Sequence, residues 1–466
     1  MRSILLSLII SISTASFAAD VVPAPIAPPT PLMPQAPIAP SAFEEQMREN
    51  LQVEKFQLAN GLTVLLHVDM GVPVVAYHQW FRVGSSDEKV GRTGLAHFFE
   101  HLMFKGTPSM SGREYELAIH SNGGSNNAFT TRDYTGYYTY LPSEKLELAI
   151  KIESDRMRNL LFDAKEINSE REVVKEERRM RYENDVFGAL NELLYSTVYK
   201  TSEYRWPVIG YMADLNATSL DELKSFYNTY YAPNNSVVVV AGAFDKEKAK
   251  KLIEKYYGNL KSQPIPATKY TPEAEQKSTR RAKITKPVQN LTYSMTFLAP
   301  AAGHVDNYAL DLLANVLGEG TSSRLYKSVI YQSQLASSIG AYNGSSKQSG
   351  IFSISASAKP KVSAGQIENK IKAEIDKVKK DLVSKREFEK VQNQVLMSYV
   401  SSLKTIGGKA RSLALNEIYF NDYSAMFKDL AEYNKVTLAD IKRVANKYLD
   451  YKKASVVLVE PSGVLK

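Results

Sequence analysis

The chain has 466 residues, of which 44% are hydrophobic and 23% are charged, and its formal net charge at pH 7 is +8. These values are close to globular averages, so they exclude a chain that is mostly disordered, collagen-like or of low complexity. The lack of cysteine excludes disulfides, thiolate metal sites, a cysteine nucleophile and a lipoprotein anchor. Basic residues alternate with acids along helical stretches and form no basic stripe, so we expect no nucleic-acid partner.

Residues 1–18 have the pattern of a secretory signal peptide. A positive start at Arg2, an apolar run over 4–12 and small residues after it predict cleavage after Ala18, although an uncleaved membrane anchor is the alternative. No other run approaches the roughly 18 apolar residues of a bilayer span, so we expect no stable membrane span in the mature chain and a periplasmic or secreted location. Residues 19–42 are rich in proline and predict a disordered, extended leader.

The folded part is expected to begin at residue 43, and its first element is a hairpin. Apolar alternation over 55–67, with Asn60 and Gly61 at the turn, is typical of two antiparallel strands. Further strands are predicted at 73–82, as a pair over 125–142, and at 236–241, and further helices over much of 144–184 and at 218–230.

A helix–strand unit occurs twice, at a constant separation of 218 positions. Each copy leads into a valine-rich strand, so the pattern predicts an internal duplication, with chance agreement of common helix residues as the alternative. The matching residues are Ser219, Leu220, Lys224, Asn228 and Tyr230 in the first copy, and Thr437, Leu438, Lys442, Asn446 and Tyr448 in the second.

The duplication predicts an α+β fold of two homologous lobes, each a mostly antiparallel sheet packed with helices. The N-terminal lobe is expected over 43–261 and the C-terminal lobe over 285–466. Residues 262–284 are rich in proline and charge and have no apolar period, which is typical of a flexible linker. Two lobes joined in this way would form a clamp.

The segment from Leu95 to Leu102 carries two histidines four residues apart. Its apolar residues recur at helical spacing, so His97 and His101 would project from one helix face and could bind one zinc ion. Glu100 lies near the same face and could act as a general base without ligating the metal. The order H-x-x-E-H is the inverzincin pattern, and the alternative is a pair of helix histidines with ordinary polar roles.

A catalytic zinc site needs a third protein ligand and an open position. The acidic helix expected from about Ala164 onward offers several carboxylates. Glu170 and Glu177 are seven residues apart and therefore share one face, while Glu176 points elsewhere. One face thus offers a ligand and a second carboxylate, and a solvated acidic helix is the alternative.

Together these motifs resemble the pitrilysin/insulinase family of zinc metallopeptidases over about residues 50–465. The similarity is to the short-subunit branch, which includes the beta subunit of the mitochondrial processing peptidase and bacterial two-subunit peptidases. In that family H-x-x-E-H is followed, some 75 residues later, by a glutamate in a segment like E-R-x-x-V-x-x-E, here 170–177. The resemblance implies a zinc metalloendopeptidase that cleaves peptides or unfolded segments.

The resemblance also assigns roles to individual residues. It implies that one Zn²⁺ per chain is held by His97, His101 and Glu177. It implies that Glu100 is the general base and that Glu170 assists catalysis near the metal. In the second half of the duplication the equivalent positions are Asn315, Gly318 and Glu319, so we expect no second metal site there.

Residues 123–130 resemble the edge strand with which the family binds the substrate backbone, which implies substrate-binding roles for Asn127, Ala128 and Phe129. The alternative is an ordinary Gly-Asn turn before a hairpin.

One family feature is missing. Self-sufficient members usually carry an arginine and a tyrosine, seven apart, that hold substrate over the zinc, and this chain has Ile330 and Ser337 there. The resemblance therefore implies the zinc-bearing subunit of a heterodimer, whose homologous partner supplies the arginine and tyrosine. The alternatives are a catalytically silent peptide-binding or assembly subunit and, from another class, a metal-storage or sensing protein.

Overall fold

The computed structural model of the chain describes residue 45, residues 47–267 and residues 270–462. These residues belong to one compact unit, Pro40–Lys466. The predicted signal peptide (1–18) and the predicted leader (19–42) lie outside the described residues and remain predictions. Within the described part, no helix combines the length and the apolar character needed to cross a lipid bilayer.

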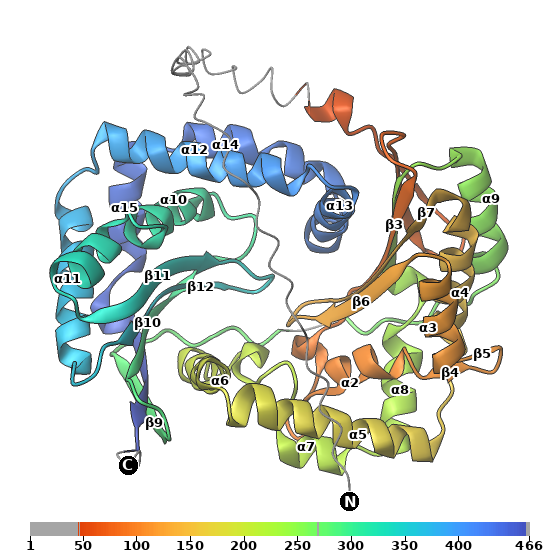
Figure 1. Ribbon diagram of the computed structural model, residues 1–466, viewed down its shortest axis with the longest axis horizontal. Helices are drawn as coiled ribbons and strands as arrows, with labels where there is room; N and C mark the ends of the chain where they lie inside the picture. The colour runs from red at the N-terminus through yellow and green to blue at the C-terminus, as the bar shows by residue number, and fades with distance from the viewer. Residues whose placement is uncertain (1–44, 46, 268–269, 463–466) are drawn as a thin grey trace, which may run out of the picture. The chain divides into compact units, whose positions relative to one another are not determined.

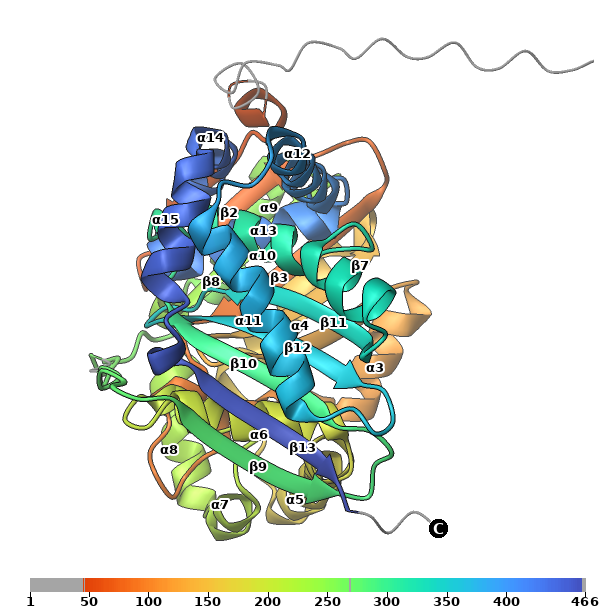
Figure 2. The ribbon, with the colours of Figure 1, turned by 90° about the vertical axis from the view of Figure 1, so that its left-hand side faces the viewer.

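The prediction of an α+β fold with two lobes is confirmed, and each half of the chain builds its own sheet (Figures 1 and 2). β1 and β2 form the hairpin predicted around Asn60 and Gly61, where the φ of 86° at Gly61 favours glycine. β6 pairs only with β7, so it lies at the edge of the sheet. In spatial order the strands of the first sheet are β1 (Glu54–Gln57), β2 (Thr63–Val68), β8 (Ser236–Gly242), β3 (Val74–Phe81), β7 (Thr135–Pro142) and β6 (Ser125–Thr130).

The second sheet repeats the topology of the first. Its strand order, β9-β13-β10-β12-β11, corresponds strand by strand to β2-β8-β3-β7-β6 of the first sheet. In both sheets the first two strands of this order are parallel, and the other neighbouring strands are antiparallel. The internal duplication is therefore visible in the architecture. The strands are β9 (Arg280–Lys286), β13 (Ser455–Pro461), β10 (Thr292–Ala299), β12 (Gly350–Ala358) and β11 (Ala336–Gly344), and a small ribbon in the first half pairs β4 (Gly106–Thr107) with β5 (Met110–Ser111).

Most helices of each half pack against their own sheet and enclose a core. The two copies of the duplicated helix, α8 and α15, begin at the capping boxes of Ser219 and Thr437. The helices of the first half are α2 (Leu95–Leu102), α3 (Gly112–Ser121), α4 (Leu146–Arg158), α5 (Ala164–Arg178), α6 (Val186–Val198), α7 (Met212–Ala217), α8 (Leu220–Tyr230) and α9 (Lys246–Tyr257). Those of the second half are α10 (Asp306–Gly318), α11 (Ala364–Lys380), α12 (Lys385–Ser402), α13 (Ile406–Phe420), α14 (Asp429–Lys435) and α15 (Leu438–Tyr448).

The remaining face of each sheet is covered by a helix from the opposite half. α13 packs Leu413 into a cluster with Trp80 of the first sheet, and α6 packs Leu194 into a cluster with Val457 of the second (Figure 1). Both clusters are apolar, so each sheet depends on the other half for part of its burial. The two halves are therefore interlocked and do not meet at a simple surface.

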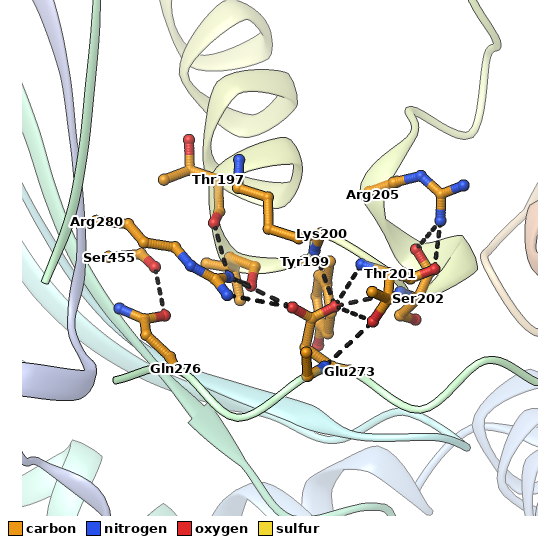
Figure 3. A network of polar contacts seen from close by, with 12 residues as sticks. Thr197, Tyr199, Lys200, Thr201, Ser202, Arg205, Glu273, Gln276, Arg280 and Ser455 are labelled. Carbon is orange, nitrogen blue, oxygen red and sulfur yellow. Dashed lines mark hydrogen bonds and ion pairs between the residues drawn. The ribbon is translucent and has the colours of Figure 1, made fainter. Parts of the chain in front are cut away.

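The segment between the halves is held in place by a buried carboxylate, in contrast to the flexible linker that the sequence predicts (Figure 3). Glu273 Oε2 accepts hydrogen bonds from the backbone N–H groups of residues 200–202 at 2.8, 2.9 and 3.1 Å. Arg280 donates to the carbonyl oxygen of Thr197 at 3.2 Å and lies 3.4 Å from Glu273 Oε1. Such charge-assisted bonds fix the segment against the end of α6.

The second sheet also begins inside the range predicted as linker, 262–284, because β9 starts at Arg280. This strand alternates exposed charged residues with half-buried ones such as Ala282 and Ile284. Such alternation is typical of an edge strand with one solvated face. Because basic residues dominate β9, its sequence was interpreted as part of the linker and the strand was not predicted.

Candidate metal centre

α2 starts at a backbone position that favours glycine. Gly94 has a φ of 91°, and a Cβ there would lie 2.6 Å from the carbonyl oxygen of Ile209. The buried carboxylate of Glu88 accepts the backbone N–H groups of Gly94 and Ala96 at 2.8 Å each, which satisfies donors that the first turn leaves free. The apolar face of α2 enters the core of the first half through Leu95, Ala96, Phe98, Phe99 and Leu102.

The opposite face of α2 lines a cavity of about 790 Å³, with His97, Glu100 and His101 in its wall. α5 and β6 line the same cavity. The structure therefore brings together all the residues for which the sequence predicts a role at the site, including Glu170 and Glu177 on α5.

α5 presents its carboxylates as the helix spacing predicts. Asp163 accepts the backbone N–H groups of Lys165 and Glu166 at the start of the helix, and Ile167 and Val174 anchor it in the core. The side chains of Glu170 and Glu177 are only 7% and 16% exposed and face α2. In contrast, Glu176 is 59% exposed and pairs with Arg179 on the outer surface.

His97, His101 and Glu177 place one ligand atom each within 4.8 Å of one another, and within the described residues no other set of three does so. Glu177 Oε2 lies 3.7 Å from His97 Nε2 and 3.2 Å from His101 Nε2. Ligand atoms around a tetrahedral zinc ion, each roughly 2.1 Å from the metal, are about 3.4 Å apart. Glu177 Oε2 is also buried and faces both imidazoles, so the spacing and the chemistry of this donor set fit a zinc ion.

A hydrogen bond orients one of the two imidazoles. His101 Nδ1 lies 2.8 Å from Glu170 Oε1, and the other oxygen of Glu170 pairs with Lys105. This bond leaves His101 Nε2 for the metal and forms the carboxylate–histidine pair that is usual behind a metal ligand. No hydrogen-bond partner of His97 Nδ1 is found in the described part of the chain.

The two imidazoles have opposite pKa shifts in the metal-free chain. Burial lowers the pKa of His97 to about 4. Burial would also lower the pKa of His101, but the hydrogen bond with Glu170 and the neighbouring Glu177 carboxylate raise it to about 9. The same contacts hold the pKa values of Glu170 and Glu177 below their ordinary range, although burial opposes them.

Glu100 lies beside the three-residue cluster without belonging to it. Its Oε2 accepts a hydrogen bond from Thr130 Oγ1 at 2.7 Å. Burial raises the pKa of Glu100, and the bond from Thr130 opposes part of that rise. A carboxylate with a raised pKa is a stronger base, and Thr130 ties it to the sheet edge.

β6 brings the sheet edge to the cavity, where residues 127–130 line its wall. Thr130 points toward α2, whereas Phe129 packs against Trp80 on the other face of the sheet. The free edge of β6 offers backbone N–H and C=O groups that an extended peptide could pair with. Substrate-binding roles for Asn127, Ala128 and Phe129 remain a prediction.

Ile330 and Ser337 lie away from the cavity, in the second half. Ile330 is half-buried against the core of that half, and Ser337 Oγ donates to the carbonyl oxygen of Ser357 at 3.2 Å. Neither lines the cavity. Asn315, which corresponds to His97 in the duplication, donates within α10 to the carbonyl oxygen of Asp311.

The sequence analysis missed three residues that contact the site: Lys105, Thr130 and Arg181. Lys105 lies four positions after His101, and Arg181 lies four positions after Glu177. Residues four apart are neighbours on one face of a helix. That spacing could have identified both. Thr130 meets Glu100 only through the tertiary fold, so its contact had no local signal.

The chain is similar to known peptidases over most of its length. The family model described as "Insulinase (Peptidase family M16)" matches residues 63–210, and the one described as "Peptidase M16 inactive domain" matches residues 217–395. Zinc protease PqqE of Helicobacter pylori is 31% identical over 418 residues, covering 88% of this chain and 93% of that protein. A protein of Bacillus subtilis described as "Uncharacterized zinc protease YmxG" is 28% identical over 413 residues, covering 88% of this chain and 99% of that protein.

Solved structures have the same fold. The crystal structure of a protease from Helicobacter pylori matches with a TM-score of 0.85 at 29% identity and covers 88% of this chain and 100% of that one. A putative M16-like peptidase from Alicyclobacillus acidocaldarius matches with a TM-score of 0.80 at 21% identity, covering 88% and 99%, and this likeness concerns the fold alone.

Proposed function

Because the chain belongs to the insulinase family of peptidases, family M16, we propose that it is a zinc-dependent endopeptidase that cleaves extended peptides or unfolded segments. The observation that carries the proposal is the spacing of the buried Glu177 Oε2, which lies 3.7 Å from His97 Nε2 and 3.2 Å from His101 Nε2, close to the separation of ligand atoms around a tetrahedral zinc ion. This donor set suits zinc, and it lies beside a free strand edge.

When bound, zinc would supply Lewis-acid chemistry, lowering the pKa of a water molecule and polarising the scissile carbonyl. The chain's own residues do the rest. Glu100 accepts the proton of the attacking water at its carboxylate and delivers it to the leaving amine. Thr130 keeps Glu100 in place, and Glu170 orients His101 through Nδ1.

The substrate would bind as an added strand along β6. Main-chain hydrogen bonds at residues 127–129 would give an extended peptide its affinity regardless of most side chains. Most main-chain groups of a folded protein are already paired with one another, which favours peptides and unfolded segments as substrates.

We further propose that the active enzyme is a heterodimer. The positions at which family members with a complete site carry an arginine and a tyrosine hold Ile330 and Ser337, and neither side chain could stabilise a developing oxyanion as a guanidinium would. A homologous partner subunit would supply that pair. With residues 1–18 as a signal peptide, the pair would act in a periplasm or outside the cell.

A catalytically silent peptide-binding subunit is the second candidate, since the match to the inactive domain covers residues 217–395. That match leaves out the three metal-binding candidates and Glu100, which all lie within 63–210. The site thus favours the peptidase.

The test uses the full chain after zinc loading, with hydrolysis of a quenched peptide measured alone and with a homologous partner that carries the arginine and tyrosine. We expect one zinc per chain, weak hydrolysis alone and strong hydrolysis with the partner. Full activity alone, unchanged by a partner, would refute the heterodimer. No hydrolysis in either sample, despite bound zinc, would favour the silent subunit.

The variant Glu100→Gln tests the assignment of the base. It keeps the hydrogen bond from Thr130 and the ligand set, so zinc should stay bound while the rate falls by at least about 10²–10⁴-fold. If Glu100→Gln binds one zinc per chain and still hydrolyses the peptide at the wild-type rate, Glu100 is not the general base.

A further inference from the structure

Arg181 contacts the candidate ligand Glu177 from the side away from the imidazoles. Its Nη1 lies 2.8 Å from Glu177 Oε1, whereas Glu177 Oε2 faces His97 and His101. The two oxygens of one carboxylate are thus divided between a cation and the metal position. The Arg181 side chain is 72% exposed at the cavity wall, and the Glu177 side chain is 16% exposed.

On the basis of the proposed zinc site, we propose that Arg181 is a positioning residue that holds Glu177 with Oε2 turned toward the metal. A free glutamate side chain has three rotatable torsions, and ordering it costs conformational entropy when the metal binds. An ion pair on Oε1 orders the carboxylate in advance. Residues behind metal ligands typically act in this way, and their loss costs about 10–100-fold in metal affinity.

The backbone that carries Arg181 is itself fixed. Arg181 lies in a π-turn, η3 (Arg179–Glu183), which joins α5 to α6, and π-turns are frequent at functional sites. α6 packs so closely on this turn that a Cβ at Gly188 would lie 1.7 Å from the carbonyl oxygen of Arg181. Asp185 caps α6 at the backbone N–H of Gly188, and Lys286 donates to the carbonyl oxygen of Glu183. The guanidinium therefore extends from a rigid support.

The same helix end offers a matched control. Arg179 pairs with Glu176, also at 2.8 Å, but both side chains are exposed, at 43% and 59%, and neither lines the cavity. Surface pairs of this kind contribute little to stability. Substituting Arg179 with alanine removes the same charge as the Arg181 substitution, at a position only two residues away. Arg179 does not contact a candidate ligand, so any effect of charge alone should appear in both variants.

Two effects of Arg181 on zinc affinity have opposite signs. As a nearby cation, the guanidinium repels the metal, so its removal would tighten binding if charge alone mattered. As a positioning group, it orders the ligand, so its removal would weaken binding. The direction of the change therefore distinguishes the two roles.

The experiment measures zinc affinity of the full chain by competition with a chromophoric chelator, for wild type, Arg181→Ala, Arg181→Lys and Arg179→Ala. We expect about 10–100-fold weaker binding for Arg181→Ala, an intermediate loss for Arg181→Lys, and wild-type affinity for Arg179→Ala. The visible spectrum of the Co²⁺-loaded protein, which reports ligand geometry, should change only in the Arg181 variants.

Unchanged or tighter zinc binding by Arg181→Ala would overturn the positioning role while leaving the proposed zinc site intact. Equal losses in the Arg181 and Arg179 variants would overturn it too, because they would reflect general charge. A wild-type chain that binds no zinc would overturn both this inference and the proposed function. Circular dichroism of the metal-free variants checks that the exposed substitutions leave the fold unchanged.

Discussion

Zinc binding near neutral pH should release one proton, and that proton should come from His101. In the metal-free chain Glu170 and Glu177 raise the pKa of His101 to about 9, so at pH 7 about 99% of the imidazole is protonated. Burial lowers the pKa of His97 to about 4, so this second imidazole is already neutral. Since only the neutral ring can ligate, binding must displace one proton.

The magnitude follows from the distance between pH 7 and that pKa. At pH 7, two units below this pKa, only about 1% of the His101 imidazole is neutral and able to bind zinc. Protonation therefore weakens the apparent zinc affinity about 100-fold, which corresponds to about 2.7 kcal/mol of binding free energy. Apparent zinc affinity should therefore rise about tenfold per pH unit between pH 7 and pH 9 and level off above. Glu170→Gln keeps an acceptor beside His101 Nδ1 but removes its charge, so the pKa of His101 should fall and proton release at pH 7 should drop well below one.

Calorimetric titration of the metal-free chain with zinc, in buffers of different ionisation enthalpy, counts the protons directly. Glu172→Gln is the control, because Glu172 lies on the same helix, is 64% exposed and pairs with Lys175 rather than with a histidine. No proton released by the wild type at pH 7, or an affinity that stays flat from pH 6.5 to 8.5, would refute the reasoning.

Two further predictions concern single carboxylates. Glu177→Gln should lose most of its zinc while the neighbouring Glu176→Gln keeps it, because only Glu177 faces the imidazoles; equal zinc content in the two purified variants would show that the helix face is misassigned. Burial raises the pKa of Asp429 from 3.8 to about 6, so the folded state holds its proton more tightly than the unfolded state and the free energy of unfolding should fall by about 2 kcal/mol as pH rises from 4 to 6. Asp429→Asn should remove that slope and be the more stable protein at pH 7 in urea unfolding, and identical pH profiles would contradict this.

Local periodicity predicted which side chains of the site share a helix face. The positions of His97, Glu100 and His101 on one helix face, and of Glu170 and Glu177 on another, follow from 3.6 residues per turn, and the structure places both faces on one cavity. That these two helices meet does not follow from spacing, and the expectation came from resemblance to a family. The contact between Thr130 and Glu100 joins a strand to a helix, and no local pattern marks it.

The fold was predictable where elements are regular and repeated. The duplicated unit at Ser219 and Thr437 predicted two similar lobes, and the sheets have the same strand order. The exchange of α6 and α13 was not visible in the sequence. An amphipathic helix has the same apolar stripe whichever sheet it covers, so Leu194 and Leu413 identify a buried face but not the partner of that face.

That exchange has a consequence for the order of events during synthesis. The first sheet is complete in sequence once β8 has emerged at residue 242, but α13, which covers its second face, begins only at residue 406. At 5–20 residues per second, the ribosome needs roughly 10–30 s to make the intervening chain. During that time the apolar face around Trp80 and Val239 has no partner helix and is accessible to a chaperone. The nascent first half is therefore the stage at which this protein is most exposed to aggregation, and completion of α13 ends it.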